Sequence, residues 1–175
     1  MGRILGSWSG MKKYLEREML AESLKGRIKY TCAQYDGMDG GHIFEVLADG
    51  RSVKRFSWET VNSYFIKNSG KNPDLKQDRS VGVDEYWAGF LQALYDCPIN
   101  SRTEYTDDEF CKALKMYRNQ NIQDSIYSDD PIQRMFAVLD RRLGKRTLAV
   151  IKKDIDRQPG WLHFFYDMRM RAEGI

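Results

Sequence analysis

Residues 129–148 read DDPIQRMFAVLDRRLGKRTL, and this stretch carries the clearest fold signal of the chain. Asp130 is a favourable N-cap, and Pro131 suits the first helical position because its missing N–H would have no partner there. Apolar residues follow at helical spacing up to Gly144, a residue type that commonly follows a last helical turn. The pattern predicts a helix over 130–143.

Basic side chains crowd the end of this predicted helix. Between residues 134 and 157, eight Lys and Arg residues stand against three Asp residues, whereas the net charge of the whole chain is only +3. Charge focused in this way can attract a nucleic acid or another anion. Cations near a helix C-terminus also stabilise the helix dipole, which is the structural alternative. The candidate anion-binding residues are Arg134, Arg141, Arg142, Lys145 and Arg146.

The turn after this helix raises two further hypotheses about binding, an anion site and a DNA-binding motif. Thr147 suits the cap of a next helix over 147–157, whose first amides would lie beside Lys145 and could hold an anion. The turn is not a P-loop, since Leu139 stands where that motif requires Gly. A helix-turn-helix for DNA fits less well, because the second helix carries two acids beside its two lysines.

Upstream of this block, the apolar pattern changes from helical to alternating. Residues 8–24 place apolar side chains on one face of a helix, and three later runs, over 27–32, 42–48 and 51–58, alternate as strands do. Asp49-Gly50, between the last two runs, is typical of a two-residue hairpin turn. We therefore expect a helix on a three-stranded antiparallel β-meander.

The second half of the chain has helical spacing. An apolar stripe begins at Val83, and Thr106 with Glu109 forms a capping box before a second helix. A short turn over 122–126 precedes the block at 129–148. After Pro159-Gly160, an aromatic-rich helix follows, which packs in the core or serves as a partner-binding face. The predicted fold class is α+β, an N-terminal helix on a β-meander followed by a mostly α-helical C-terminal half.

The chain is long enough to bury one core. Its 175 residues are 42% hydrophobic, so neither a disulfide nor a metal is needed to hold that core together. Polar residues with Gly and Pro at 67–82 indicate a loop or linker. We expect a helix-plus-meander subdomain over 1–66 and an α-helical subdomain over 83–175, packed as one compact domain.

Catalytic and metal-binding motifs do not emerge from the sequence. His42 and His163 lie far apart, with no Cys or acid at ligand spacing. The acidic loop over 36–41 lacks the alternate spacing of a calcium loop. The other acidic clusters lie in the first turn of predicted helices or just before it, where they stabilise the helix dipole. The sequence thus predicts no cofactor and no metal, and an enzyme would require a histidine to meet an acid in a cleft.

Cysteine usage and hydropathy bear on the compartment. Cys32, Cys97 and Cys111 are odd in number and widely spaced, as in proteins of a reducing cytosol. No apolar run approaches the roughly 18 residues that a membrane helix needs. We expect a cytoplasmic protein that does not bind membranes.

Four stretches carry a resemblance to known proteins. They are Ser7-Trp8-Ser9, Ser23-Leu24-Lys25-Gly26-Arg27, Asp49-Gly50, and the block from Asp130 to Leu148. Together they resemble a family of small, uncharacterised bacterial proteins, over nearly the whole chain apart from its first six residues and the 67–82 segment. Since that family has no assigned activity, the resemblance implies a bacterial cytosolic protein and no catalysis.

Two functional hypotheses follow. The first is a non-catalytic interaction protein, an adaptor or inhibitor-like module, because 4 Trp, 10 Tyr, 8 Phe and 8 Met residues are available to a binding face. The second is anion or nucleic-acid binding through the basic cluster at 134–146. An enzyme is the least favoured class.

Overall fold

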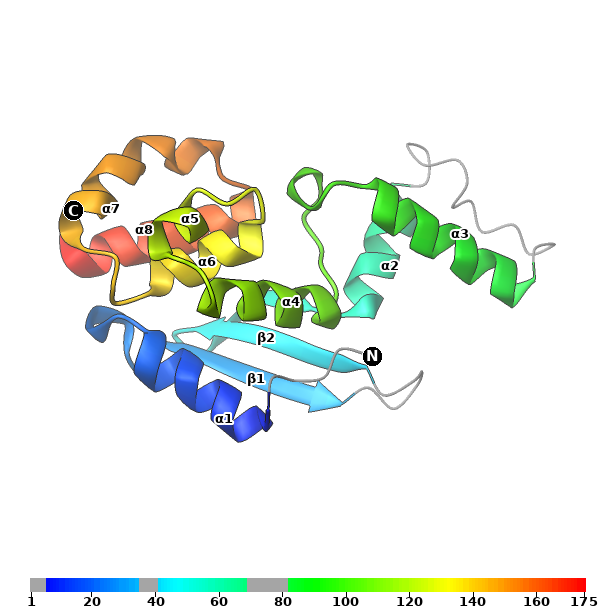
Figure 1. Cartoon of the computed structure of the whole chain (residues 1–175), viewed down its shortest axis with the longest axis horizontal. Helices are drawn as coiled ribbons and strands as arrows, with labels where there is room; N and C mark the ends of the chain where they lie inside the picture. Colours follow the sequence, from blue (N-terminus) through cyan, green and yellow to red (C-terminus); the bar gives the residue numbers. More distant parts are fainter. Residues whose placement is uncertain (1–5, 35–40, 69–81) are drawn as a thin grey trace.

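The structure is a computed structural model that describes residues 6–34, 41–68 and 82–175. Most of the predicted linker over 67–82 and of the acidic loop over 36–41 lies outside the described residues. The fold class is the expected one. An N-terminal helix and a three-stranded antiparallel sheet are followed by a mostly helical C-terminal half (Figure 1).

The sheet is a meander of β1 (Ile28–Gln34), β2 (His42–Ala48) and β3 (Arg51–Phe56), in that order. The predicted hairpin turn is confirmed, because Asp49 and Gly50 both have positive φ, at 48° and 81°. Two consecutive residues of this kind give the turn whose twist matches that of the strands it joins.

The first helix differs from the prediction over 8–24. α1 (Trp8–Lys13) continues as the π-helix η1 (Tyr14–Met19), and a 3-10 turn, η2 (Glu22–Leu24), follows separately. The helix ends because Leu20 pairs as an isolated antiparallel bridge with Asp140. Main-chain hydrogen bonds from Ala21 N–H to the Leu139 carbonyl and from Arg141 N–H to the Met19 carbonyl, both 2.9 Å, flank this bridge.

One helix was not predicted from the sequence. The strand predicted to reach Trp58 ends at Phe56, since the Ser57 side chain accepts a hydrogen bond from Thr60 N–H and caps α2 (Trp58–Lys67). Next come α3 (Val83–Asp96) and the 3-10 turn η4 (Ile99–Ser101).

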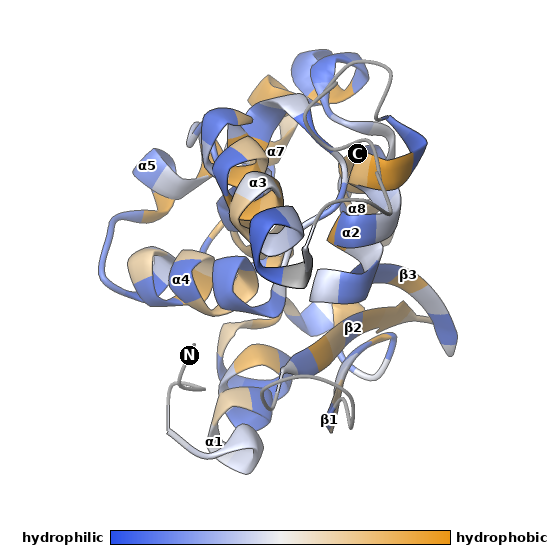
Figure 2. Ribbon diagram, turned by 90° about the vertical axis from the view of Figure 1, so that its right-hand side faces the viewer, coloured by the Kyte–Doolittle hydropathy of each residue, from blue (hydrophilic) through white to orange (hydrophobic). Residues whose placement is uncertain are grey.

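The C-terminal half is a group of helices against one face of the sheet. The capping box of Thr106 and Glu109 is confirmed at the start of α4. Figure 2 shows α1 and α4 on the same side of the strands, and the ring of Phe44 in β2 contacts both Trp8 and Phe110. The elements are α4 (Asp107–Arg118), α5 (Ile122–Ile126), α6 (Pro131–Leu139), α7 (Lys145–Ile151), the 3-10 helix η5 (Lys152–Arg157) and α8 (Gly160–Glu173).

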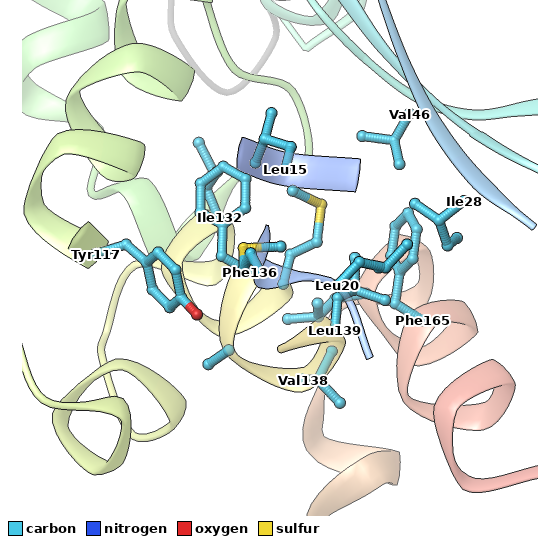
Figure 3. Close-up of a cluster of buried hydrophobic side chains, with 14 of the residues drawn as sticks. Leu15, Leu20, Ile28, Val46, Tyr117, Ile132, Phe136, Val138, Leu139 and Phe165 are labelled. Carbon is cyan, nitrogen blue, oxygen red and sulfur yellow. The ribbon is translucent and has the colours of Figure 1, made fainter. Parts of the chain in front are cut away.

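α6 is the centre of the main core. Every one of its residues except Arg134 is buried. Figure 3 shows Phe136 and Leu139 of α6 among side chains from the first helix, the sheet and α8. The block at 129–148 therefore does hold the fold together, although its ends differ from the prediction.

The predicted helix over 130–143 stops at Leu139. Asp140 has extended backbone angles, φ −74° and ψ 138°, because it forms the bridge to Leu20. Gly144 does not follow this helix; it is the N-cap of α7, which begins at Lys145. Thr147 consequently lies inside α7, and the helix expected over 147–157 is α7 followed by η5.

α2 and α3 form a second, smaller cluster. Its buried side chains are Val61 and Phe65 of α2 and Phe90 and Leu94 of α3, whereas the main core joins the sheet to α4, α6 and α8. The division into 1–66 and 83–175 stays a prediction, and the buried side chains group differently from it. Among the described residues, no helix is long and apolar enough to cross a membrane.

Candidate functional site

The five candidate cations do not form one open site. Arg134 is half-buried and donates from Nε to Gln158 Oε1 (3.0 Å) and from Nη1 to the Ser128 carbonyl (2.5 Å). The Asp130 carboxylate, four residues before Arg134, accepts instead from the N–H of Ile132 (2.8 Å). Arg134 thus holds α6 to the neighbouring turns.

Arg142, whose side chain is half exposed, completes a polar group around the buried Asp140. Its Nε and Nη2 donate to Asp140 Oδ2 at 3.0 and 2.8 Å, and the Tyr117 hydroxyl donates to the same oxygen. Burial, together with the Asp140 charge, raises the pKa of Tyr117 well above its ordinary value of 10, so the hydroxyl keeps its proton. Arg142 thus pairs with the buried Asp140 carboxylate and is engaged within the protein.

Tyr14 and Arg118 also lie near this group, which was not predicted from the sequence. The Arg118 guanidinium lies 4.6 Å from the centre of the Tyr14 ring. Burial chiefly raises the pKa of Tyr14; the Asp140 charge adds to this effect, and the charges of Arg142 and Arg118 oppose it. No spacing in the sequence brings these positions together, because π-helix η1 and the end of α4 meet only in the folded chain.

The remaining three cations lie at the surface. Lys145 donates from Nζ to the carbonyl of Glu173 (2.8 Å), at the C-terminal end of α8, where a cation is favourable. Arg141 and Arg146 are exposed, and within the part of the chain that the structure describes their side chains form no hydrogen bond or ion pair. Arg141 also lies beyond the end of α6, so it does not share a helical face with Arg134. Two of the five candidates are therefore available to a ligand.

The histidines lie in polar contacts longer than a hydrogen bond. His42 Nδ1 is 3.9 Å from Asp107 Oδ2, which accepts instead from the backbone N–H of His42 at 2.9 Å. His163 Nε2 is 3.8 Å from Asp156, whose side chain is fully exposed. Across residues 6–34, 41–68 and 82–175, no three His, Cys, Asp or Glu side chains are placed to hold a metal ion.

An open hollow of about 330 Å³ lies between α2 and the strand before it. This volume is at the lower limit for ligand pockets, and the two cations and two carboxylates of its lining balance each other. Neither a histidine nor a cysteine lines it, so a nucleophile with a histidine base is not present there. The lining residues are Arg55, Glu59, Thr60, Ser63, Tyr64, Lys67, Asn68 and Glu104.

α3 presents a surface that the sequence did not single out. Phe90 and Leu94 face α2, whereas Ala88, Leu91 and Tyr95 face solvent; we call these last three residues the α3 stripe. Leu91 is 36% exposed and Tyr95 is 79% exposed. The spacing i, i+3 and i+7 places the three on one line along the helix. In Figure 2 this helix lies on the side of the molecule that faces the viewer.

Comparison with known proteins gives a family but no activity. A family model matches residues 7–170, and the chain belongs to the SF0329 protein family. The expected membership of an uncharacterised family is thereby confirmed. No curated protein and no solved structure matches the chain.

Proposed function

We propose that this chain is a non-catalytic interaction protein that binds another protein through the α2–α3 pair. The α3 stripe is the observation that carries the proposal. Apolar side chains of α3 lie on the side that packs against α2 and also on a second side that α2 does not cover. Leu91 and Tyr95 are on this second side and remain exposed to solvent. Large side chains exposed in a row favour binding more than single scattered ones do.

The architecture around the stripe supports this role. Among the side chains that the structure describes, α2 and α3 bury four between them, apart from the core that α6 organises. Their link to the main body includes the Ser57 N–H bond to the Tyr105 carbonyl (3.0 Å) and the buried Lys54, which donates to Glu104 (2.8 Å). A small helical pair held on a firm body is suited to presenting a surface to a partner.

We place this function in a bacterial cytoplasm. The resemblance of the four sequence stretches carries the bacterial assignment. Cys32, Cys97 and Cys111 are free thiols in the structure, which supports a reducing compartment.

The test is a capture experiment from cytosol of the organism that encodes the chain, read by quantitative mass spectrometry. The bait is compared with Leu91→Gln/Tyr95→Gln and with Tyr127→Ser, a matched control whose side chain is 61% exposed on the main body. We expect one protein to be enriched by the parent and the control and lost with the double variant. Equal enrichment by all three baits would refute the role of the α2–α3 pair.

Anion or nucleic-acid binding is the second candidate function. It is supported by the exposed side chains of Arg141 and Arg146, which form no hydrogen bond or ion pair with the described residues and flank the start of α7. Two free cations provide weaker attraction than the five that the sequence suggested, because log affinity scales with the number of phosphate contacts.

A further inference from the structure

We infer that the partner of the α3 stripe is a basic amphipathic helix. This inference rests on the proposed function and names the chemistry of its partner. It draws on two features of α3, the straight line of its exposed apolar side chains and the sign of the charges around them.

The geometry of the stripe favours a helical partner. Ala88 and Tyr95 are seven residues apart, so the stripe runs about 10 Å along the axis of α3. A partner helix laid along it satisfies its own backbone N–H and C=O groups, which an irregular segment pressed on an apolar surface cannot do. Apolar residues at i, i+3 or i+4, and i+7 of that helix would pack between Leu91 and Tyr95.

The charges on α3 select a basic partner. α3 contains Asp84, Glu85 and Asp96 and no Lys or Arg, and all three acids are exposed. Asp84 is four residues before Ala88 and continues the line of the stripe, and Glu85, three residues before Ala88, lies beside it. Asp96 directly follows Tyr95 and lies on the flank of the helix, where it accepts a hydrogen bond from Gln92 Nε2 (3.0 Å). The C-terminal end of α3 adds partial negative charge near Asp96, whereas its N-terminal end offsets part of the charge of Asp84 and Glu85, which lie in the first turn. On α2, Glu59 and Lys67 cancel each other.

The packing of α2 and α3 leaves room for a third helix. Phe90 and Leu94 use one side of α3, and the stripe lies on an adjacent side that nothing described covers. A two-helix layer with four buried side chains gains apolar burial when a further helix packs on it. Lysines or arginines flanking the apolar face of that helix would meet the three acids.

Three fluorescein-labelled peptides of 18 residues test the inference. All share leucines at i, i+3, i+4 and i+7, and their other positions are Lys, Gln or Glu. Binding to the full chain is measured by fluorescence anisotropy at 50 mM and 500 mM NaCl. We expect the Lys peptide to bind at least tenfold more tightly than the Gln peptide and the Glu peptide most weakly, with the differences shrinking at high salt.

Variants locate the binding. Leu91→Gln/Tyr95→Gln should abolish binding of the Lys peptide. The charge-neutral variant Asp84→Asn/Glu85→Gln/Asp96→Asn should reduce it to the level of the Gln peptide. Tyr127→Ser and Val150→Ser remove side chains of comparable exposure elsewhere and should leave it unchanged. Circular dichroism of each variant confirms that the fold is intact.

The outcomes separate the partner chemistry from the proposed function. If the Gln and Lys peptides bind equally, and both require Leu91 and Tyr95, protein binding at the stripe stands and the basic partner is overturned. If the Lys peptide binds Leu91→Gln/Tyr95→Gln as tightly as it binds the parent, the α3 stripe is not the docking site. The inference of a basic helix fails if no peptide binds, or if sedimentation shows that a second copy of the chain occupies the stripe. In either case the capture experiment still tests the proposed function independently.

Discussion

The guanidinium of Arg142 lies against the carboxylate of Asp140, a residue that is only 1% exposed, and donates to Oδ2 from Nε at 3.0 Å and from Nη2 at 2.8 Å. The Tyr117 hydroxyl donates to the same oxygen, which joins the end of α4 to the turn after α6. Because Asp140 also pairs with Leu20, this contact holds three distant segments together. Arg142 therefore has a structural role that does not require a ligand.

Replacing Arg142 should destabilise the protein, whereas replacing its neighbour Arg141 should not. In Arg142→Ala the buried Asp140 carboxylate loses its cation, which we expect to cost about 1–3 kcal/mol, below the value for a fully buried pair because the Arg142 side chain is 49% exposed. Arg141→Ala should change the free energy of unfolding by less than about 0.5 kcal/mol. Urea denaturation of both variants measures this difference, and equal effects would contradict the structural role of Arg142.

Salt dependence should reveal how many cations can reach phosphates. With Arg141 and Arg146 alone available, the logarithm of the affinity for duplex DNA should fall with log salt at a slope of about −1.8. Arg141→Ala/Arg146→Ala should remove the binding without changing stability. A slope near −3.6, as for about four phosphate contacts, would show that Arg142 and Lys145 leave their partners on binding. Absence of binding at 50 mM salt would remove this second candidate function.

The sequence predicted most helices and strands but not the limits of its most informative helix. Pro131 and Asp130 mark the start of α6 through local capping, which a sequence displays directly. The end at Leu139 depends on the pairing of Asp140 with Leu20, a contact between residues that are far apart in the chain. Gly144 satisfied the local rule for a helix end, yet it caps the next helix.

Parts of the candidate site also lack a signal in the sequence. The charge excess near residue 140 is visible in the sequence, and Asp140 stands only two residues before its partner Arg142. The Tyr117 hydroxyl that contacts Arg142 and the Gln158 side chain that accepts from Arg134 come from distant segments, which the sequence does not show. α2 was missed because Trp58 continues the alternating pattern of β3, whereas the Ser57 cap starts a helix there. The α3 stripe was visible only in part, since spacing shows which residues are apolar and not which of them α2 covers.

Asp107 should give the stability of the protein an unusual pH dependence. Burial raises the pKa of this carboxyl above its ordinary value of 3.8, and Oδ1 has no hydrogen-bond partner in the described structure. Asp107 therefore keeps its proton to higher pH in the folded state than in the unfolded state. Protonation of Asp107 thus contributes to the free energy of unfolding fully below pH 3.8, and this contribution is lost as the pH rises through the pKa of the folded state.

Asp107→Asn removes that titration while keeping an oxygen that can accept from the His42 N–H. The variant should become more stable relative to the parent as pH rises from 3 to 7, which thermal unfolding at several pH values measures. Asp108→Asn is the matched control at the next, more exposed position of α4. A stability difference between Asp107→Asn and the parent that stays constant over this range would contradict the raised pKa.

The three thiols should differ in reactivity. Cys111 is 6% exposed, and burial raises its pKa to about 12, so little thiolate is present at pH 8. Cys32 is half-buried, and burial with the charge of Asp107 also raises its pKa. We expect iodoacetamide to modify Cys97 first and Cys111 last, as followed by peptide mass spectrometry. Early labelling of Cys111 in the folded protein would contradict its burial, and Cys97→Ser should remove the fastest phase.

The α2–α3 pair should open without unfolding the rest of the protein. Four buried side chains stabilise it, whereas α6 is buried along nearly its whole length. Amide hydrogens of α2 and α3 should therefore exchange about 10- to 100-fold faster than those of α6, because local opening requires less free energy than global unfolding.

Two matched substitutions separate the clusters, since Phe90 and Phe136 are both fully buried. Phe136→Ala should lower the global stability by about 3–5 kcal/mol and accelerate exchange everywhere, whereas Phe90→Ala should accelerate exchange in α2 and α3 alone. Uniform acceleration by Phe90→Ala would show that the α2–α3 pair is part of the main cooperative unit, and the surface that carries the α3 stripe would then be as rigid as the core beneath it.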